Sequence, residues 1–292
     1  MKGGLVAALF AGKAILEAGV RLKGRLMLQS VIGEEDGGVG TLAAIQRGYR
    51  ADGAVIMEPT DLDICPAQAG ALNFRITVRG KAAHGCVRDE GVSALEKFET
   101  VHKALLTLEQ ARNQGLSDPL FADYGIPFPL SIGVIEGGEW ASSVPDRVRA
   151  EGRYGVRPDE TLEGAQEDFR DALVGLEAAD PWFRDHPPEL EWWGGCFHPA
   201  RVSEGDPIVL GLQNSSQALG LGPRPVKGVT FGSDMRLLVR EGGIPTVLFG
   251  PGDIRAAHAA DETVSVEDVH VVARILVLTA LRFCGYEDEP SV

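Results

Sequence analysis

The hydrophobic pattern of this chain changes twice along its length, and that change limits the folds it can adopt. Residues 25–32 and 53–57 are short apolar runs, which predict buried strands. Residues 71–80 instead alternate between apolar and polar side chains, which predicts a strand with one face in solvent. An apolar run returns at 243–249. The simplest interpretation is an α/β domain interrupted by an inserted α+β domain.

The segments around these strands agree with that interpretation. Helical spacing occurs beside the apolar runs, at 5–18, 41–49, 207–217 and 266–283. Short loops between such helices and strands are typical of a parallel sheet. Inside the insertion the predicted order is strand, helix, two strands, helix, strand, over 71–80, 91–111, 129–135, 147–156, 162–176 and 189–193. That order predicts a ferredoxin-like antiparallel sheet with helices on one face.

We therefore predict a discontinuous catalytic domain, formed by 1–68 and 197–292, around an inserted lid domain, 69–196. The acidic composition limits the partners, because 42 Asp+Glu against 28 Lys+Arg give a net charge of −14. A field of that sign repels nucleic acid and anionic membranes. No apolar stretch reaches the roughly 18 residues of a transmembrane helix. We interpret the first residues as a helix rather than a signal peptide, and the four scattered cysteines as reduced thiols of a cytoplasmic protein.

Candidate metal ligands follow the ends of three apolar runs. They are Glu34 and Glu35 after 25–32, Glu58 after 53–57, and His258 after 243–249. Sites in open α/β sheets collect at the carboxyl ends of strands. Carboxylates together with an imidazole suit a divalent cation such as zinc. The chain has no P-loop, no Gly-x-Ser-x-Gly and no His-Glu-x-x-His motif, so these residues are its main chemical signal.

The adjacent pair Glu34-Glu35 is informative because neighbouring side chains do not easily chelate one ion together. One carboxylate is then free to act as a base beside metal-bound water, which metal-assisted amide hydrolysis requires. The alternative is structural: Glu35 and Asp36 lie where acidic side chains stabilise a helix N-terminus. In that case Glu58 belongs to a turn and His258 is a surface residue. The residues alone leave both interpretations open.

Several motifs resemble those of the acetylornithine deacetylase, succinyl-diaminopimelate desuccinylase, aminoacylase and carboxypeptidase G2 family of dinuclear zinc hydrolases. They are Gly33–Thr41, Glu58–Thr60, Gly80–Gly85, Phe231–Asp234, and Gly250–Gly252 leading to Ala257–Glu262. The resemblance covers the chain in family order. It implies a zinc-peptidase-like catalytic domain with an inserted lid and dimerisation domain, and two zinc ions per subunit, with Co²⁺ or Mn²⁺ as alternatives.

The resemblance also implies roles for individual residues of the catalytic domain. Glu34 would be the general base. Glu35 would bind one metal ion, Glu58 would bind the ion on the other side of the site, and His258 would be the C-terminal ligand.

In the lid, His84 would polarise the scissile carbonyl, and Arg153 would bind the substrate carboxylate as a bidentate fork. From the alternating pattern alone, Arg153 would be a solvated charge and His84 a loop residue. Ser143 precedes Val-Pro-Asp where the family often has Asn, which changes a substrate contact.

The chain opens at Met1-Lys2-Gly3-Gly4, whereas family members carry His-x-Asp and a bridging aspartate before this point. We therefore expect a catalytic domain truncated at its N-terminus, with a disrupted paired-metal site.

The first functional hypothesis is a metal-dependent hydrolase of N-acyl amino acids, of acetylornithine deacetylase type. The second is a non-catalytic remnant that forms a homodimer through the lid, by edge pairing of strands 71–80 and 146–156. The third is a metallo-dipeptidase, carboxypeptidase or carbamoyl amidohydrolase acting on a short peptide or carbamoyl compound.

Overall fold

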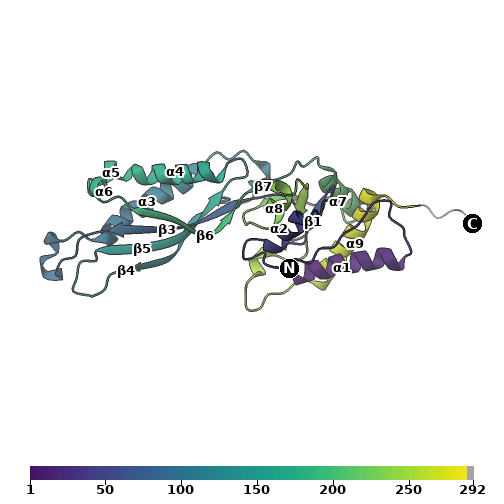
Figure 1. Ribbon diagram of the computed structural model, residues 1–292, viewed down its shortest axis with the longest axis horizontal. Helices are drawn as coiled ribbons and strands as arrows, with labels where there is room; N and C mark the ends of the chain where they lie inside the picture. Colours follow the sequence, from purple (N-terminus) through teal and green to yellow (C-terminus); the bar gives the residue numbers. More distant parts are fainter. Residues whose placement is uncertain (288–292) are drawn as a thin grey trace, which may run out of the picture. The chain divides into compact units, whose positions relative to one another are not determined.

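The computed structural model describes residues 1–287, which form two compact units. Unit 1 comprises Met1–Gln68, Ala200–Val229 and the described residues from Ser233 onward, and unit 2 comprises Ala69–Pro199 with Thr230–Gly232. Figure 1 shows the elements of each unit. Among the helices of residues 1–287, none combines the length and the apolar character needed to cross a bilayer.

Unit 1 is a mixed α/β unit. Its strands are β1 (Ala54–Ile56), β2 (Ile64–Gln68), β7 (Ala200–Arg201), β8 (Val226–Val229) and β9 (Thr246–Leu248). Its helices are α1 (Lys2–Glu17), α2 (Val39–Gln46), α7 (Pro207–Ala218), α8 (Met235–Arg240) and α9 (Val266–Cys284), with a 3₁₀ turn, η3 (Ile254–Ala256).

The strand order in unit 1 is β1-β9-β2-β7, with β8 on β2. β1 and β9 are parallel, but β2 runs antiparallel to β9, so the expectation of a parallel sheet is only partly right. The connection from β1 to β2 is too short for the crossover helix that parallel strands need. It turns back through Asp61 and Leu62, which both have positive φ.

Helices α1 and α9 cover the sheet of unit 1 and contact each other. Ala7 of α1 packs in the apolar core with Val272 and Ile275 of α9 and with Val247 and Phe249 near β9. All five are less than 9 % exposed. This core therefore fixes the strand end from which the chain leads on to His258.

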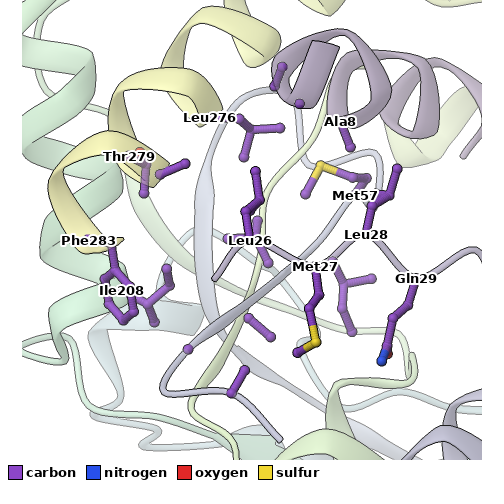
Figure 2. Close-up of a pocket in the computed structure, with 18 of the residues that line it drawn as sticks. Ala8, Leu26, Met27, Leu28, Gln29, Met57, Ile208, Leu276, Thr279 and Phe283 are labelled. Carbon is purple, nitrogen blue, oxygen red and sulfur yellow. The ribbon is translucent and has the colours of Figure 1, made fainter. Parts of the chain in front are cut away.

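The strand predicted over 25–32 does not form. Within the described chain, residues 25–31 have no backbone hydrogen bonds, and β1 pairs with β9 alone. An apolar run indicates burial, but a strand also needs a partner edge. The segment instead lines a largely apolar cavity of about 1590 Å³ in unit 1. Figure 2 shows Leu26, Met27 and Leu28 among the lining residues, with Leu26 between α9 and Met57 and Leu28 beside Met57.

Unit 2 contains the predicted order of strands and helices. Its elements are β3 (Gly70–Arg79), η1 (Gly85–Glu90), α3 (Ala94–Asn113), η2 (Pro119–Phe121), β4 (Leu130–Gly137), β5 (Arg147–Val156), α4 (Leu162–Val174), α5 (Leu176–Ala179), α6 (Trp182–Asp185) and β6 (Glu189–Phe197). The antiparallel sheet has the order β4-β5-β3-β6. Helices α3 and α4 cover one face, where Phe74 and Phe169 pack at 4.9 Å between ring centroids.

The strand edges of unit 2 differ from the prediction. Strands 71–80 and 146–156 were expected to be free for pairing with a second copy, but β3 lies between β5 and β6, and β5 lies between β4 and β3. Both backbone edges of these strands are therefore already used. β4 and β6 are the edge strands, since β4 pairs only with β5 and β6 pairs only with β3.

Candidate active site

The loop that carries Glu34 and Glu35 connects the extended segment 25–32 to α2. Gly38 is the N-cap of α2 and has φ 78°, a left-handed conformation that favours glycine. The backbone N–H of Gly38 donates to the carbonyl of Gly33, at 2.6 Å, which closes the loop on itself. Glu34 is half-buried and Glu35 is exposed, so the two neighbours face different environments.

Glu58 lies directly after β1 and is only 8 % exposed. Its pKa is raised to about 7, first by burial and then by the nearby negative charge of Glu34. Asp234 and Glu35 add smaller effects in the same direction. A buried carboxyl among other carboxyls is costly to ionise unless a cation is close.

The loop toward His258 leaves the sheet beside Glu58, because β9 is the parallel neighbour of β1. Gly250 donates its N–H to the Thr60 hydroxyl, at 3.1 Å, and a Cβ at Gly250 would lie 2.3 Å from the Glu58 carbonyl oxygen. Only a glycine allows this close approach. The two strand ends are thus held together by the backbone.

His258 reaches the loop of Glu35. Its Nε2 lies 3.0 Å from Oε1 of Glu35, and both side chains are largely exposed. His258 has φ 62°, a left-handed conformation that is uncommon for a residue other than glycine. Its backbone N–H donates to the carboxylate of Glu262, at 3.3 Å. The structure therefore brings together two of the three predicted metal ligands.

Glu34, the predicted base, has its pKa raised to about 6, first by burial and then by the charges of Asp234 and Glu35. Arg236 and His258 act in the opposite direction. Asp234 is an acidic residue of this cluster to which the sequence analysis gave no role. It is 4 % exposed and accepts a hydrogen bond from the Thr41 hydroxyl at 2.6 Å. Its place in the Phe231–Asp234 motif is the signal in the sequence that points to this segment.

The cluster suits a divalent cation chemically, since carboxylate oxygens and an imidazole nitrogen are the ligands that such ions take. Glu34, Glu58 and Asp234 also line the cavity of unit 1. However, within residues 1–287 no group of three or more His, Cys, Asp or Glu is arranged to hold a metal ion. Glu35 and His258 form a hydrogen-bonded pair, and Glu35 also contributes to the raised pKa of Glu58 through its charge.

In unit 2, His84 and Ser143 are neighbours across an antiparallel bridge. The backbone N–H of Val144 donates to Ala83, at 2.9 Å, and that of Gly85 donates to Ser142, at 2.6 Å. The His84 Nδ1 accepts from the N–H of Cys86 at 3.1 Å. A neutral His84 therefore carries its proton on Nε2, where it can be donated to a carbonyl oxygen.

Arg153 is not a freely solvated charge. It lies on β5 between Asn73 of β3 and Ser131 of β4, and its Nη2 donates to the Thr230 carbonyl at 2.8 Å. Burial lowers the pKa of its guanidinium. This contact connects the sheet of unit 2 with Thr230–Gly232, so Arg153 has a structural partner in addition to its predicted substrate role.

A half-buried glutamate beside a carboxylate–imidazole pair, on loops at one edge of an α/β sheet, is an arrangement that acid–base hydrolysis can use. The chain belongs to Peptidase family M20/M25/M40, whose profile matches residues 1–282. Members of this family are hydrolases that act on amide bonds. The family resemblance and the zinc-peptidase-like fold predicted from the sequence are thereby confirmed.

Two relatives illustrate the range of the family. The chain is 32 % identical to the N-formyl-4-amino-5-aminomethyl-2-methylpyrimidine deformylase of Bacillus subtilis (strain 168), covering 99 % of this chain and 71 % of the relative. It is 30 % identical to an acetylornithine deacetylase of Myxococcus xanthus, and the match covers 91 % of this chain and 67 % of the relative. The chain thus spans roughly seven tenths of these relatives' length.

Solved structures share the fold. The M20 family metallo-carboxypeptidase Sso-CP2 of Sulfolobus solfataricus superimposes with a TM-score of 0.72 at 18 % identity, covering 96 % of this chain and 75 % of that one. The YXEP protein of Bacillus subtilis, a dinuclear metal-binding peptidase of the M20 family, superimposes with a TM-score of 0.65 at 16 % identity. The match covers 95 % of this chain and 70 % of that one.

Proposed function

We propose that this chain hydrolyses the N-acyl amide bond of a small amino-acid-like substrate. The observation that carries the proposal is the contact between Glu35 and His258, directly beside a Glu34 whose pKa is raised to about 6. A carboxylate with that pKa is mostly ionised at neutral pH, yet it takes up a proton more readily than an ordinary glutamate. Proton transfer in both directions is what a hydrolytic base requires.

The names of the relatives support a small acyl group. One relative is a deformylase of an N-formyl compound and another is an acetylornithine deacetylase. Both names describe removal of a one- or two-carbon acyl group from nitrogen. Formyl and acetyl amides are therefore the first substrates to test, ahead of dipeptides, C-terminal peptide residues and carbamoyl compounds.

In the proposed reaction Glu34 takes a proton from the attacking water as the carbon–oxygen bond forms. It then delivers this proton to the leaving nitrogen as the carbon–nitrogen bond breaks, which yields a carboxylic acid and an amine, present at neutral pH as carboxylate and ammonium. His84 is proposed to donate its Nε2 proton in a hydrogen bond to a substrate carbonyl. Arg153 is proposed to bind a substrate carboxylate, with Ser143 as a further polar contact.

The proposed cofactor is zinc, with Co²⁺ or Mn²⁺ as alternatives, which the adjacent pair Glu35 and His258, together with Glu58, would hold. A divalent ion would supply Lewis-acid activation of the attacking water. The acidic cluster supports this assignment, because a cation would offset both the burial and the like-charge repulsion that raise the pKa of Glu58 to about 7. The metal-binding relative of known structure also supports it.

A homodimer through unit 2 is a second proposal, and β4 is its edge. Val134 and Ile135 on this edge strand are 47 % and 57 % exposed, and Trp140, just beyond it, is 73 % exposed. Exposed apolar side chains on an unpaired edge favour pairing with another strand.

The four cysteines form no disulfide in the described chain, which supports a reducing compartment such as the cytoplasm.

The test is hydrolysis by the purified chain, first stripped of metal and then supplied with Zn²⁺, Co²⁺ or Mn²⁺. The substrates are N-acetylornithine, N-formyl and N-acetyl amino acids, a dipeptide and an N-carbamoyl amino acid. Metal-dependent release of formate or acetate supports the proposal. Turnover of the dipeptide or of the carbamoyl compound alone would instead support the third hypothesis, a peptidase or a carbamoyl amidohydrolase. No turnover with any metal, in a folded dimer, favours the non-catalytic remnant.

A further inference from the structure

The segment Ser233–Arg236, at the start of α8, buries two charged side chains beside the proposed active site. Asp234 is 4 % exposed and Arg236 is 6 % exposed. Charges are rarely buried so fully unless they are paired or hydrogen-bonded. Their partners therefore indicate what the segment does.

Both charged side chains bind the Glu34–Glu35 loop and the helix that follows it. Oδ2 of Asp234 accepts from the Thr41 hydroxyl at 2.6 Å. Nη2 of Arg236 donates to the carbonyl oxygen of Gly37 at 2.9 Å. Hydrogen bonds to ionised groups are stronger than those between neutral groups. The two bonds hold the chain on either side of Gly38.

The Gly38 backbone lies directly against the Asp234 carboxylate. A Cβ at Gly38 would stand 2.0 Å from Oδ1 of Asp234. That oxygen has no hydrogen-bond partner among the described residues. The loop itself is closed by backbone bonds from Gly37 to Glu34, at 3.1 Å, and from Gly38 to Gly33, at 2.6 Å.

The segment is fixed on its other side to β2 through Gln68, which is fully buried. Oε1 of Gln68 accepts from the Ser233 hydroxyl at 2.5 Å and from the Ser233 N–H at 3.1 Å. The Ser233 oxygen in turn accepts from the Met235 N–H at 3.1 Å. The contacts thus run from the sheet, through the start of α8, to the loop.

We propose that Asp234 and Arg236 are positioning residues that fix the backbone path of Glu34–Gly38 and so aim the carboxylates of Glu34 and Glu35. The inference rests on the proposed function for the role of those carboxylates. Displacement of a catalytic group by about 1 Å can cost roughly 100-fold in rate, so a rigid loop is functionally necessary.

The test removes each contact and pairs it with a conservative variant. Thr41→Val removes the hydroxyl that binds Asp234, and Thr41→Ser retains it. Arg236→Met removes the guanidinium, and Arg236→Lys keeps a cation. Thr279→Val is the matched control, because Thr279 is equally buried at 4 % exposure and its hydroxyl has no hydrogen-bond partner in the described chain.

The first readout is hydrogen exchange of the backbone amides of Gly37, Gly38 and Gly40, which all donate within the loop region. We expect Thr41→Val and Arg236→Met to speed their exchange about tenfold through local opening. Exchange in α9 should stay unchanged. Thr41→Ser should restore protection, and Thr279→Val should leave the loop unaffected.

The second readout is the division between kcat and KM. We expect kcat to fall about 100-fold in Thr41→Val with KM changed less than about threefold, and Thr41→Ser to recover kcat. Faster exchange with unaltered kcat would make the contacts structural only and overturn the inference. Unaltered exchange, or an equal effect of Thr279→Val, would also overturn it. An inactive wild-type chain would instead refute the proposed function, while exchange still decides whether the loop is held.

Discussion

His258 Nε2 lies 3.0 Å from Glu35 Oε1, although 223 positions separate the two residues in sequence. β1 and β9 are parallel neighbours, so the loops that follow them, which carry Glu58 and lead to His258, leave the same edge of the sheet. The Glu34–Glu35 loop reaches this edge from the extended segment that precedes α2. An exposed carboxylate and imidazole at this distance can share a proton or a metal ion.

The first prediction concerns metal binding. His258→Ala and Glu35→Ala should each weaken Zn²⁺ binding by at least about tenfold, because each removes one of two adjacent donors. His270→Ala is the control, since His270 is an exposed histidine on α9. Titration calorimetry on the metal-stripped protein gives the affinities. Equal Zn²⁺ affinity in wild type and His258→Ala would exclude His258 as a ligand.

The second prediction concerns the base. Glu34→Gln should lower kcat about 100- to 10,000-fold, because a neutral amide cannot take up a proton. In wild type, kcat/KM should fall on the acidic side as Glu34 becomes protonated, with a midpoint at or below pH 6, because its pKa is about 6 without metal and a bound cation lowers it. Asp36→Asn tests an exposed carboxyl of the same loop and should keep most activity. If the residual activity of Glu34→Gln shows the same fall in kcat/KM at low pH, that fall belongs to the titration of another group.

Sequence patterns predicted strands where alternation marks a half-buried surface. The strand at 147–156 is confirmed because Val148, Ala150 and Tyr154 face the core while arginines alternate with them. The run at 25–32 was wrong as a strand, since apolar residues indicate burial without identifying a pairing edge. The edge strands of unit 2 were wrongly predicted for a similar reason: which strands lie at the edge depends on the strand order β4-β5-β3-β6, and the pattern within one strand does not contain that order.

The acidic cluster was only partly predictable for a related reason. Glu34, Glu35, Glu58 and His258 each follow an apolar run, so their order along the chain indicated one sheet edge. Asp234 acts through Thr41, 193 positions away, and a pattern within one segment contains no information on such a contact. Burial of its carboxyl could be recognised only once the fold was known.

The third prediction links Glu58 to stability. In the metal-free protein its pKa is about 7, against 4.5 for a free glutamate, so the folded state binds more protons than the unfolded state between these pH values. The free energy of unfolding should therefore decrease as pH rises from 4.5 to 7, by at most roughly 3 kcal/mol. Glu58→Gln should flatten this dependence, and Glu204→Gln, at an exposed site in the same unit, should not. Urea unfolding at several pH values measures it. Stability that rises over this range would contradict the buried, acid-surrounded position of Glu58.

The fourth prediction tests the proposed dimer. Ile135→Lys on β4 should shift the chain toward monomer, because a buried lysine at a strand-pairing edge is unfavourable. Val174→Lys is the control at a comparably exposed apolar site of unit 2, 68 % exposed against 57 % for Ile135. Sedimentation velocity gives the oligomeric state of each. If Ile135→Lys remains as dimeric as wild type, the edge of β4 is not the interface.

The fifth prediction concerns the buried ion pairs of unit 2. Arg112 of α3 is 5 % exposed and binds the carboxylates of Glu160 and Asp168 and, at 3.1 Å, the carbonyl of Gly155. Its guanidinium also lies 4.6 Å from the ring centroid of Tyr154. The residue thus connects α3, the end of β5 and α4 in one charged network.

Arg112→Met should lower the free energy of unfolding by about 3 kcal/mol, because Glu160 would keep a largely buried charge without its main partner. Arg157, whose backbone N–H donates to Glu160 at 2.6 Å, limits the loss. Arg170→Met removes an exposed arginine of α4 and should change stability by less than about 0.5 kcal/mol. Urea unfolding followed by tryptophan fluorescence suits the measurement, since Trp182 and Trp192 pack against the core of unit 2. Equal stabilities of the two variants would mean that the network contributes specificity of packing rather than stability.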